Sequence, residues 1–470
     1  MIAQVLNRQF VLDQLEEVRS FLESEVKDGR RGPADPELPE LETEDLQAAL
    51  DHARGAQARE AAESSGQAGV EPPPPDRRGP EPAPLDDLSF FARDATLSNL
   101  QSALEQYLTT RQADDVKTEE DDGRRSDDGE VAVTDTEISG LPLRRDDDGR
   151  RVLDQFSVLD IRWVSSLFAM GVRRFRKRVA WNPEPAPPLP IDGRARLVVV
   201  GDWGSGIPRA KKVAAEMRKV LDEGKGNREQ HVIHLGDVYY SGWEYEYRSR
   251  LLADWPVQGG EPIGSWNLNG NHDMYAGGYA FFDTALADPR FGRQRSRDGQ
   301  ATSFFSLVND HWRILGLDTS WDEHGLKDPQ ATWAKEELAS GAQKGLLLSH
   351  HQIFSSYEPS KKEPELLTKI RPVLAGGRVR SWFWGHEHRC VLYDAAEGVA
   401  AARCVGHGGV PVYRTHADDE PVPPPGFYEY RGFLEKGLER WALFGFAVLD
   451  FEGPEIDVRY IDENGEVHHR

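Results

Sequence analysis

The sequence is poor in cysteine, in long apolar runs and in positive charge. It has two cysteines, Cys390 and Cys404, among 470 residues. This excludes a disulfide scaffold and predicts two buried thiols in a reducing compartment. No apolar run reaches the roughly 20 residues that a membrane-spanning helix needs. The net charge of −23 argues against general binding to nucleic acid or anionic membranes, which need a positive surface, although a local basic patch stays open.

The first residues also lack the pattern of a secretory signal. The chain starts MIAQVLNRQF, which has neither a basic segment nor the uninterrupted apolar segment that follows one in a signal peptide. We therefore expect a cytoplasmic protein.

The first 193 residues read as an extension that precedes one compact catalytic domain at 194–470. A proline-rich linker and an acidic low-complexity linker separate its helical parts. The predicted segments are a helical segment at 1–58, the proline-rich linker at 59–87, a helical segment at 88–111, the acidic linker at 112–151, and a basic amphipathic helix with a proline-rich spacer at 152–193.

Two helical stretches of this extension suggest contacts. Residues 3–27 carry apolar side chains at alternating spacings of four and three, which is typical of a helix docked on its own chain or of self-association through a short coiled coil. Residues 152–181 end in a basic cluster. That helix either packs on the catalytic domain, or contacts a membrane surface or an acidic protein partner.

The C-terminal part has short apolar runs typical of buried strands, separated mostly by helical or loop segments. This alternation predicts an α/β fold in which sheets are buried between helices. The runs are LVVV at 197–200, HVIHL at 231–235, WRILGL at 312–317, KGLLLS at 344–349, RSWFWG at 380–385 and FAVLDF at 446–451.

Side chains of the metal-ligand type follow most of these runs. Open α/β sheets place ligands just beyond the carboxyl ends of their strands, where the loops converge on one crevice. Carboxylate and amide oxygens together with imidazoles suit Zn, Mn or Fe, and their number exceeds the need of one ion. The candidates are Asp202 in GDWGSG, Asp237 and Tyr240 in GDVYY, Asn271 and His272 in GNHD, His350 and His351 in SHH, and His386 and His388 in GHEH.

These five motifs, in this order, resemble the blocks of the calcineurin-like metallophosphoesterase superfamily. The resemblance implies a two-sheet β-sandwich flanked by helices, and it covers about 196–455. Within the superfamily the pattern resembles purple acid phosphatases. Gly204 stands where most members have a ligand histidine, and Tyr240 stands three residues after Asp237. A phenol would thus replace the lost imidazole, and Tyr239 is assigned to packing.

The resemblance also implies a ligand set. The first metal would be held by Asp202, Tyr240, His388 and the bridging Asp237, and the second by Asp237, Asn271, His350 and His386. His350 is preferred to His351 because of its place in the family motif, although Gln352 replaces the proline of that motif.

Other polar residues are assigned roles around these ligands. We expect His272 to donate a proton to the leaving alkoxide, and Asp273 to orient its imidazole. His351 is placed beside the ligands or on the substrate side. His407 either approaches the substrate or is a loop histidine bonded to the backbone.

A phenolate is a hard anionic donor, so the implied pair is Fe(III) with a divalent ion such as Zn, Mn or Fe. The expected reaction is hydrolysis of a phosphate ester by attack of a metal-bound hydroxide on phosphorus. Two alternatives stay open: a phosphodiesterase or nucleotide-cleaving enzyme that uses the same site, and a catalytically inactive scaffold protein. The sequence names neither the substrate nor the second metal.

Overall fold

The computed structural model describes residues 178–469 except 323, 357–363, 415–426 and 434–439. Before residue 178 it describes scattered positions between 91 and 105, which are helical from 95 on, and the backbone of an antiparallel pair, β1 (Leu143–Arg145) and β2 (Arg151–Leu153). The chain divides into one unit over Ile2–Lys177 and another over Arg178–Arg470. The contacts predicted for 3–27 and 152–181 lie outside the described residues.

A six-stranded sheet forms one half of the second unit. Its central strands β4, β5 and β6 are parallel, and β16 joins β4 in the antiparallel sense. Every residue of β4 and β5 is buried, which explains the nearly continuous apolar sequence of β4. In spatial order the strands are β18 (Val467–His469), β17 (Glu455–Asp462), β16 (Gly445–Glu452), β4 (Arg196–Val200), β5 (Gln230–His234) and β6 (Gly264–Asn267).

An eight-stranded sheet forms the other half. Strands β8, β9, β10 and β12 are parallel neighbours within it. In spatial order it contains β14 (Phe427–Glu429), β11 (Cys390–Tyr393), β12 (Ala401–Val405), β10 (Val379–Trp384), β9 (Lys344–Ser349), β8 (Trp312–Gly316), β7 (Phe305–Val308) and β3 (Leu189–Pro190). A separate two-stranded sheet pairs β13 (Tyr413–Arg414) with β15 (Arg440–Trp441). All six predicted strands are present.

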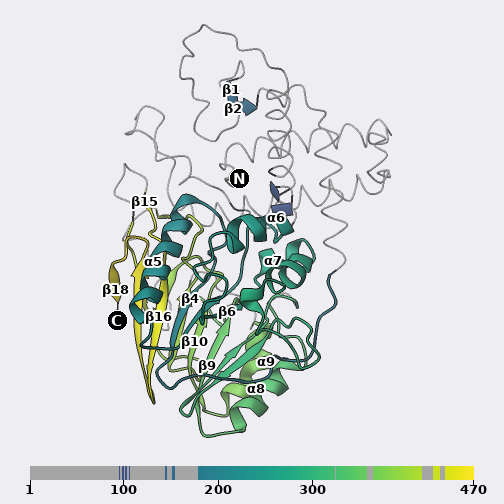
Figure 1. Cartoon of the computed structure of the whole chain (residues 1–470), viewed down its shortest axis with the longest axis vertical. Helices are drawn as coiled ribbons and strands as arrows, with labels where there is room; N and C mark the ends of the chain where they lie inside the picture. Colours follow the sequence, from purple (N-terminus) through teal and green to yellow (C-terminus); the bar gives the residue numbers. More distant parts are fainter. Residues whose placement is uncertain are drawn as a thin grey trace. The chain divides into compact units, whose positions relative to one another are not determined.

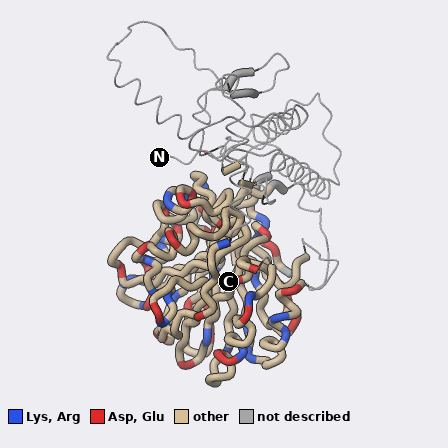
Figure 2. Tube along the Cα trace, turned by 90° about the vertical axis from the view of Figure 1, so that its right-hand side faces the viewer, with Lys and Arg blue, Asp and Glu red and all other residues tan. Residues whose placement is uncertain are grey.

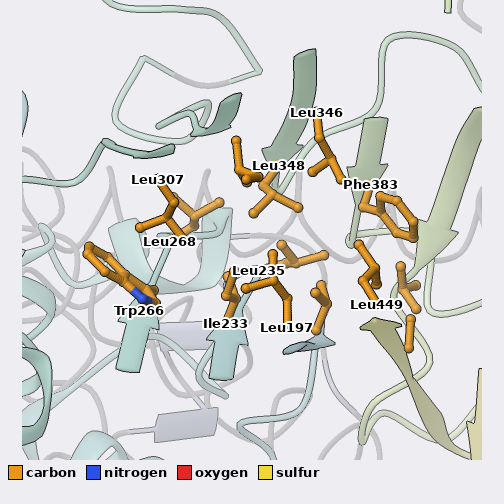
Figure 3. Packing of buried hydrophobic residues seen from close by; sticks show 14 of the residues in the cluster. Leu197, Ile233, Leu235, Trp266, Leu268, Leu307, Leu346, Leu348, Phe383 and Leu449 are labelled. Carbon is orange, nitrogen blue, oxygen red and sulfur yellow. The ribbon is translucent and has the colours of Figure 1, made fainter. Parts of the chain in front are cut away.

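The two sheets pack face to face around an apolar core. Leu197 and Ile233 from the six-stranded sheet meet Leu346, Leu348 and Phe383 from the eight-stranded sheet (Figure 3). Full burial of one such side chain contributes about 1.5–3 kcal/mol. This core fixes the carboxyl ends of β4, β5, β9 and β10 relative to one another, and these ends carry the candidate ligands.

Helices cover the outer faces, which gives the predicted sandwich flanked by helices. In Figure 1, α5 lies beside β4 and β16, while α8 and α9 lie beside β9. Pro208 begins α5 at a position where no amide hydrogen is needed, and Val213, Met217, Val220 and Leu221 of α5 are buried. The α-helices of this unit are α5 (Pro208–Gly224), α6 (Glu244–Glu246), α7 (Asn271–Tyr275), α8 (Gln330–Ala339) and α9 (Glu365–Leu374).

The compact unit begins before the predicted boundary at residue 194, because the proline-rich spacer is part of it. The Trp181 indole donates a hydrogen bond to Asp318 at 3.1 Å, and its ring stacks on Phe304. Farther along, β3 pairs in parallel with β7 and forms the edge of the eight-stranded sheet. The spacer therefore belongs to the catalytic unit.

Charged residues of both signs are interspersed along this unit (Figure 2). Among the described residues, no helix is both long and apolar enough to cross a membrane.

Candidate metal centre

Four candidate ligands stand directly after central strands and adopt an unusual backbone conformation. Asp202 follows β4, Asp237 follows β5, and His386 and His388 follow β10. Their φ angles are 56°, 74°, 69° and 52°, in the same order. Non-glycine residues rarely adopt this left-handed region, and such residues concentrate at functional sites. The fold thus turns each of these side chains sharply at the strand end.

The first group of donors surrounds Asp202. One ligand atom each from Asp202, Asp237 and His388 lies within 4.8 Å of the others. The hydroxyl of Tyr239 lies among them, 3.0 Å from Asp202 Oδ1, 3.1 Å from Asp237 Oδ2 and 3.0 Å from His388 Nε2. Both carboxylates and the tyrosine are buried.

The second group shares Asp237 with the first. Ligand atoms of Asp237, His350 and His386 lie within 4.8 Å of one another. His350 Nε2 is 3.4 Å from Asp237 Oδ2 and 3.0 Å from Asn271 Oδ1. The Asn271 amide nitrogen donates to the Tyr275 hydroxyl at 2.6 Å, so its oxygen is the atom that faces the histidine. The structure thus brings together six of the predicted ligands, with Asp237 in the middle.

The seventh predicted ligand is a correction. We expected Tyr240 to supply the phenol and Tyr239 to pack beside it, but the hydroxyl among the donors belongs to Tyr239. The Tyr240 ring instead lies under the guanidinium of Arg250, 4.9 Å from its Cζ atom, and its backbone amide donates to Glu246. Adjacent side chains point in different directions, and the spacing from Asp237 did not reveal which one turns inward.

Two glycines make room for this arrangement. A β-carbon on Gly204 would lie 2.8 Å from the carbonyl oxygen of Asp237 and 2.9 Å from Val238 Cα. The space that a side chain at position 204 would need is therefore filled by the backbone of Asp237 and Val238. A β-carbon on Gly270 would overlap Asp237 Oδ1. Both positions need glycine because Asp237 and the backbone after it approach them so closely.

His272 is buried, and a backbone carbonyl holds its ring. Its Nδ1 donates to the Tyr240 carbonyl oxygen at 2.5 Å, and the ring packs against Tyr239 and Tyr275 with centroids 4.4 and 4.7 Å apart. With the proton on Nδ1, a neutral ring carries a lone pair on Nε2. Burial lowers the pKa of His272 to about 3.

The prediction that Asp273 orients this imidazole is wrong, because the Asp273 carboxylate serves four other donors. Oδ2 accepts from the backbone amides of Asp237 and Gly270 at 2.8 and 2.6 Å. Oδ1 accepts from the backbone amide of Val238 at 3.0 Å and from the Tyr247 hydroxyl at 2.5 Å. Asp273 therefore fastens the loop that carries Asp237 and Tyr239 to the start of α7.

The two remaining candidates lie in different places. His351 is buried beside the second donor group, with its ring centroid 4.7 Å from that of His386 and 3.7 Å from that of His324. His324 is a neighbour that the sequence analysis missed. His407 instead lies in a group with Cys390 and His468, so its side chain belongs to a different cluster.

The charges of the centre favour a cation. Burial, with the neighbouring charges of Asp202 and Asp273, raises the pKa of Asp237 well above its usual value. Burial also raises the pKa of Asp202. A hydrogen bond with His388 and the charges of His350 and His388 outweigh this effect and lower the pKa of Asp202 to about 2. Burial lowers the pKa of His350 to about 4, and neutral imidazoles are the form that binds metal. Two buried carboxylates among oxygen and nitrogen donors therefore fit metal ions.

Comparison with known proteins gives four likenesses. The family model described as calcineurin-like phosphoesterase matches residues 195–390. Tartrate-resistant acid phosphatase type 5 of Homo sapiens is 22% identical over 301 residues, which are 57% of this chain and 88% of that protein.

Among solved structures, the purple acid phosphatase PPD1 of yellow lupin seeds has a TM-score of 0.41 at 16% identity, covering 61% of this chain and 54% of that one. GAP50, the anchor in the inner membrane complex of Plasmodium, has a TM-score of 0.42 at 14% identity, covering 59% and 87%.

Proposed function

We propose that this chain, a metal-dependent phosphoesterase whose residues 195–390 belong to the calcineurin-like family, hydrolyses phosphate esters at a centre of two metal ions. The observation that carries the proposal is the shared carboxylate. Asp237 is a member of both donor groups, one with Asp202 and His388 and the other with His350 and His386. A carboxylate placed between two sets of donors is suited to bridge two ions.

The chain's own residues divide into two sets around that bridge. Asp202, Tyr239 and His388 would hold the first ion with Asp237, whereas the second ion would take Asn271, His350 and His386. When bound, two such ions activate water at neutral pH and neutralise the charge of a phosphoryl group. The buried side chains contribute by holding the donors in fixed positions and by keeping bulk water away from the carboxylates.

Tyr239 supports iron as the first ion and the purple acid phosphatase-like type. Its hydroxyl lies within hydrogen-bond distance of both carboxylates and can donate its one proton to either, and burial followed by their charges keeps its pKa well above the usual value. Tyr239 would bind a trivalent ion as the phenolate, releasing its proton to solvent, because a phenolate is a hard donor that prefers Fe(III). Two carboxylates and a phenolate carry a charge of about −3 against about +5 for the proposed ion pair, which leaves the centre attractive to phosphate.

His272 is proposed to protonate the leaving oxygen. It stands next to Asn271 on α7, and the Tyr240 carbonyl and the Tyr239 and Tyr275 rings fix its plane. Because burial lowers the pKa of His272 to about 3, the ring must first take up a proton on Nε2, while Nδ1 stays bonded to the carbonyl, before it can act in this way. His272→Gln should therefore lower kcat while leaving the metal content unchanged. Loss of metal in this variant would show a structural role instead.

The two adjacent tyrosines offer a matched test of the proposal. Protein loaded with iron and zinc should show a phenolate-to-iron absorption band in the visible range and should hydrolyse a chromogenic phosphate monoester. Tyr239→Phe should abolish the band, whereas Tyr240→Phe should keep it. A band that survives Tyr239→Phe and disappears in Tyr240→Phe would overturn the assignment of the phenol. Active, iron-loaded protein without any band would overturn the iron–phenolate part and leave the phosphoesterase.

The same preparation defines the substrate class. Initial rates with a monoester and a diester of the same chromophore show which class the site prefers. Failure to hydrolyse either ester, with both ions bound, would contradict the proposed function itself.

A further inference from the structure

A second cluster of metal-ligand side chains lies apart from the catalytic donors. It consists of Cys390 at the start of β11, His407 in the loop after β12, and His468 in β18. One ligand atom from each lies within 4.8 Å of the others. Cys390 and His407 are buried at 2% and 3% exposure, and His468 is partly buried. Three residues from distant parts of the sequence thus converge on one point.

His468 supplies an independent indication that this point is a site. Both of its ring nitrogens are buried, and neither meets a hydrogen-bond partner among the described residues. The ring plane is fixed, because Tyr430 stacks on it with ring centroids 3.5 Å apart and planes 11° apart. Buried polar atoms normally have partners, and a missing one calls for an explanation such as an ion. A metal ion bound to one ring nitrogen would provide that partner.

We propose that Cys390, His407 and His468 bind a further metal ion, and that Zn²⁺ is the ion they fit. One thiolate and two imidazoles are typical zinc donors, and three protein ligands leave a fourth position for water. The cluster differs from the catalytic centre, whose donors are oxygen and nitrogen atoms. On binding, the Cys390 thiol gives up its proton to solvent, and its sulfur lone pair forms the bond to zinc.

The geometry permits this with small movements. Zn–S and Zn–N bonds of about 2.3 and 2.0 Å set donor separations of roughly 3.3–3.6 Å in a tetrahedron. The present donor atoms, all within 4.8 Å of one another, therefore need to move inward by no more than about 1.5 Å. Tyr430 keeps the His468 ring in place, so this movement falls to the Cys390 and His407 side chains.

Such an ion would connect the edge strand of one sheet to the strand next to the edge of the other. Cys390 belongs to the eight-stranded sheet and His468 to the six-stranded sheet. The backbone around His407 also reaches the catalytic strands, since its carbonyl accepts from Gly445 and the next amide, Gly408, donates to Gly201. Gly201 directly precedes Asp202. The proposed zinc therefore holds the C-terminal strand against the loops of the catalytic domain.

Cobalt substitution tests the proposal in the full chain, because only a thiolate ligand gives Co²⁺ a strong absorption band in the near ultraviolet. The band should appear in metal-free protein reconstituted with Co²⁺. It should be lost in Cys390→Ser and in His468→Gln, the latter by loss of one imidazole ligand. Cys404→Ser is the matched control and should keep the band, because Cys404 is directed at the carbonyl oxygens of Arg389 and Gly385.

Each outcome decides the proposal. A missing band in the wild-type chain, or a band that persists in Cys390→Ser, overturns it. If Cys390→Ser does not fold, loss of the band in folded His468→Gln supports it, and retention of the full band there overturns it. Zinc should also raise the midpoint of thermal unfolding of the wild-type chain more than that of His468→Gln. Phosphoesterase activity is measured separately, so failure here leaves the proposed function intact.

Discussion

Replacement of Asp273 by asparagine tests how the catalytic loop is held. The carboxylate accepts four hydrogen bonds, three from backbone amides and one from Tyr247. In Asp273→Asn, the amide side chain would keep one oxygen for the backbone amides of Asp237 and Gly270, but its NH₂ group would face the amide of Val238. An unsatisfied buried donor costs about 1–3 kcal/mol, and the remaining bonds lose their charge assistance. We therefore expect a loss of about 3 kcal/mol in the free energy of unfolding.

The assay is urea unfolding followed by circular dichroism, combined with the metal content. Asp273→Asn should also bind both ions more weakly, because Asp237 and Tyr239 lie on the loop that it fastens. Asp283→Asn is the control, since Asp283 is exposed and should change the unfolding free energy by less than about 0.5 kcal/mol. Equal midpoints for the two variants would refute the reasoning, as would full metal content in Asp273→Asn.

Three further predictions follow from the same region. Gly270→Ala should remove activity and lower the unfolding midpoint, because its β-carbon would overlap Asp237 Oδ1; activity at the wild-type level would contradict this. A chelator should abolish hydrolysis, and added metal should restore it; hydrolysis that survives complete removal of metal would show a different chemistry. Burial lowers the pKa of His234 from 6.5 to about 4. As the pH falls, His234 is therefore protonated in the unfolded chain before it is protonated in the folded protein. The contribution of neutral His234 to the free energy of unfolding is therefore fully present above pH 6.5. Roughly 3 kcal/mol of the free energy of unfolding should be lost as the pH falls towards 4. Unfolding of His234→Asn should show a smaller change between pH 7 and pH 4.5, and an identical change would contradict the assignment.

The sandwich could be predicted because its central strands are buried on both faces. Strands β4 and β9 are continuous apolar runs followed at once by polar residues, so both the strand and the ligand position are visible in the sequence. Strand β17 was missed for the opposite reason. Its burial varies along its length, and its sequence EIDVRYID mixes charged and apolar residues. The short β3 was read as a spacer because its proline and those that precede it hide its pairing with β7.

The convergence of six candidate residues could be predicted for a similar reason, since all of them except His388 follow a glycine or a strand end. The direction in which each side chain points could not be predicted. The choice between Tyr239 and Tyr240 depends on Arg250 and Glu246, which hold the second tyrosine from outside the motif. The role of Asp273 depends on three backbone amides that converge only in the fold. His407 follows a glycine after a strand as the ligands do, yet it meets Cys390 and His468.

The central claim is that one carboxylate, Asp237, is shared by two metal ions that act together. The most direct test is a titration of metal-free Cys390→Ser, which lacks the proposed third site, with iron and then zinc while the hydrolysis of a chromogenic phosphate ester is followed. We expect activity to rise only as the second ion per chain binds. Full activity with one ion bound, or with none, would contradict the claim.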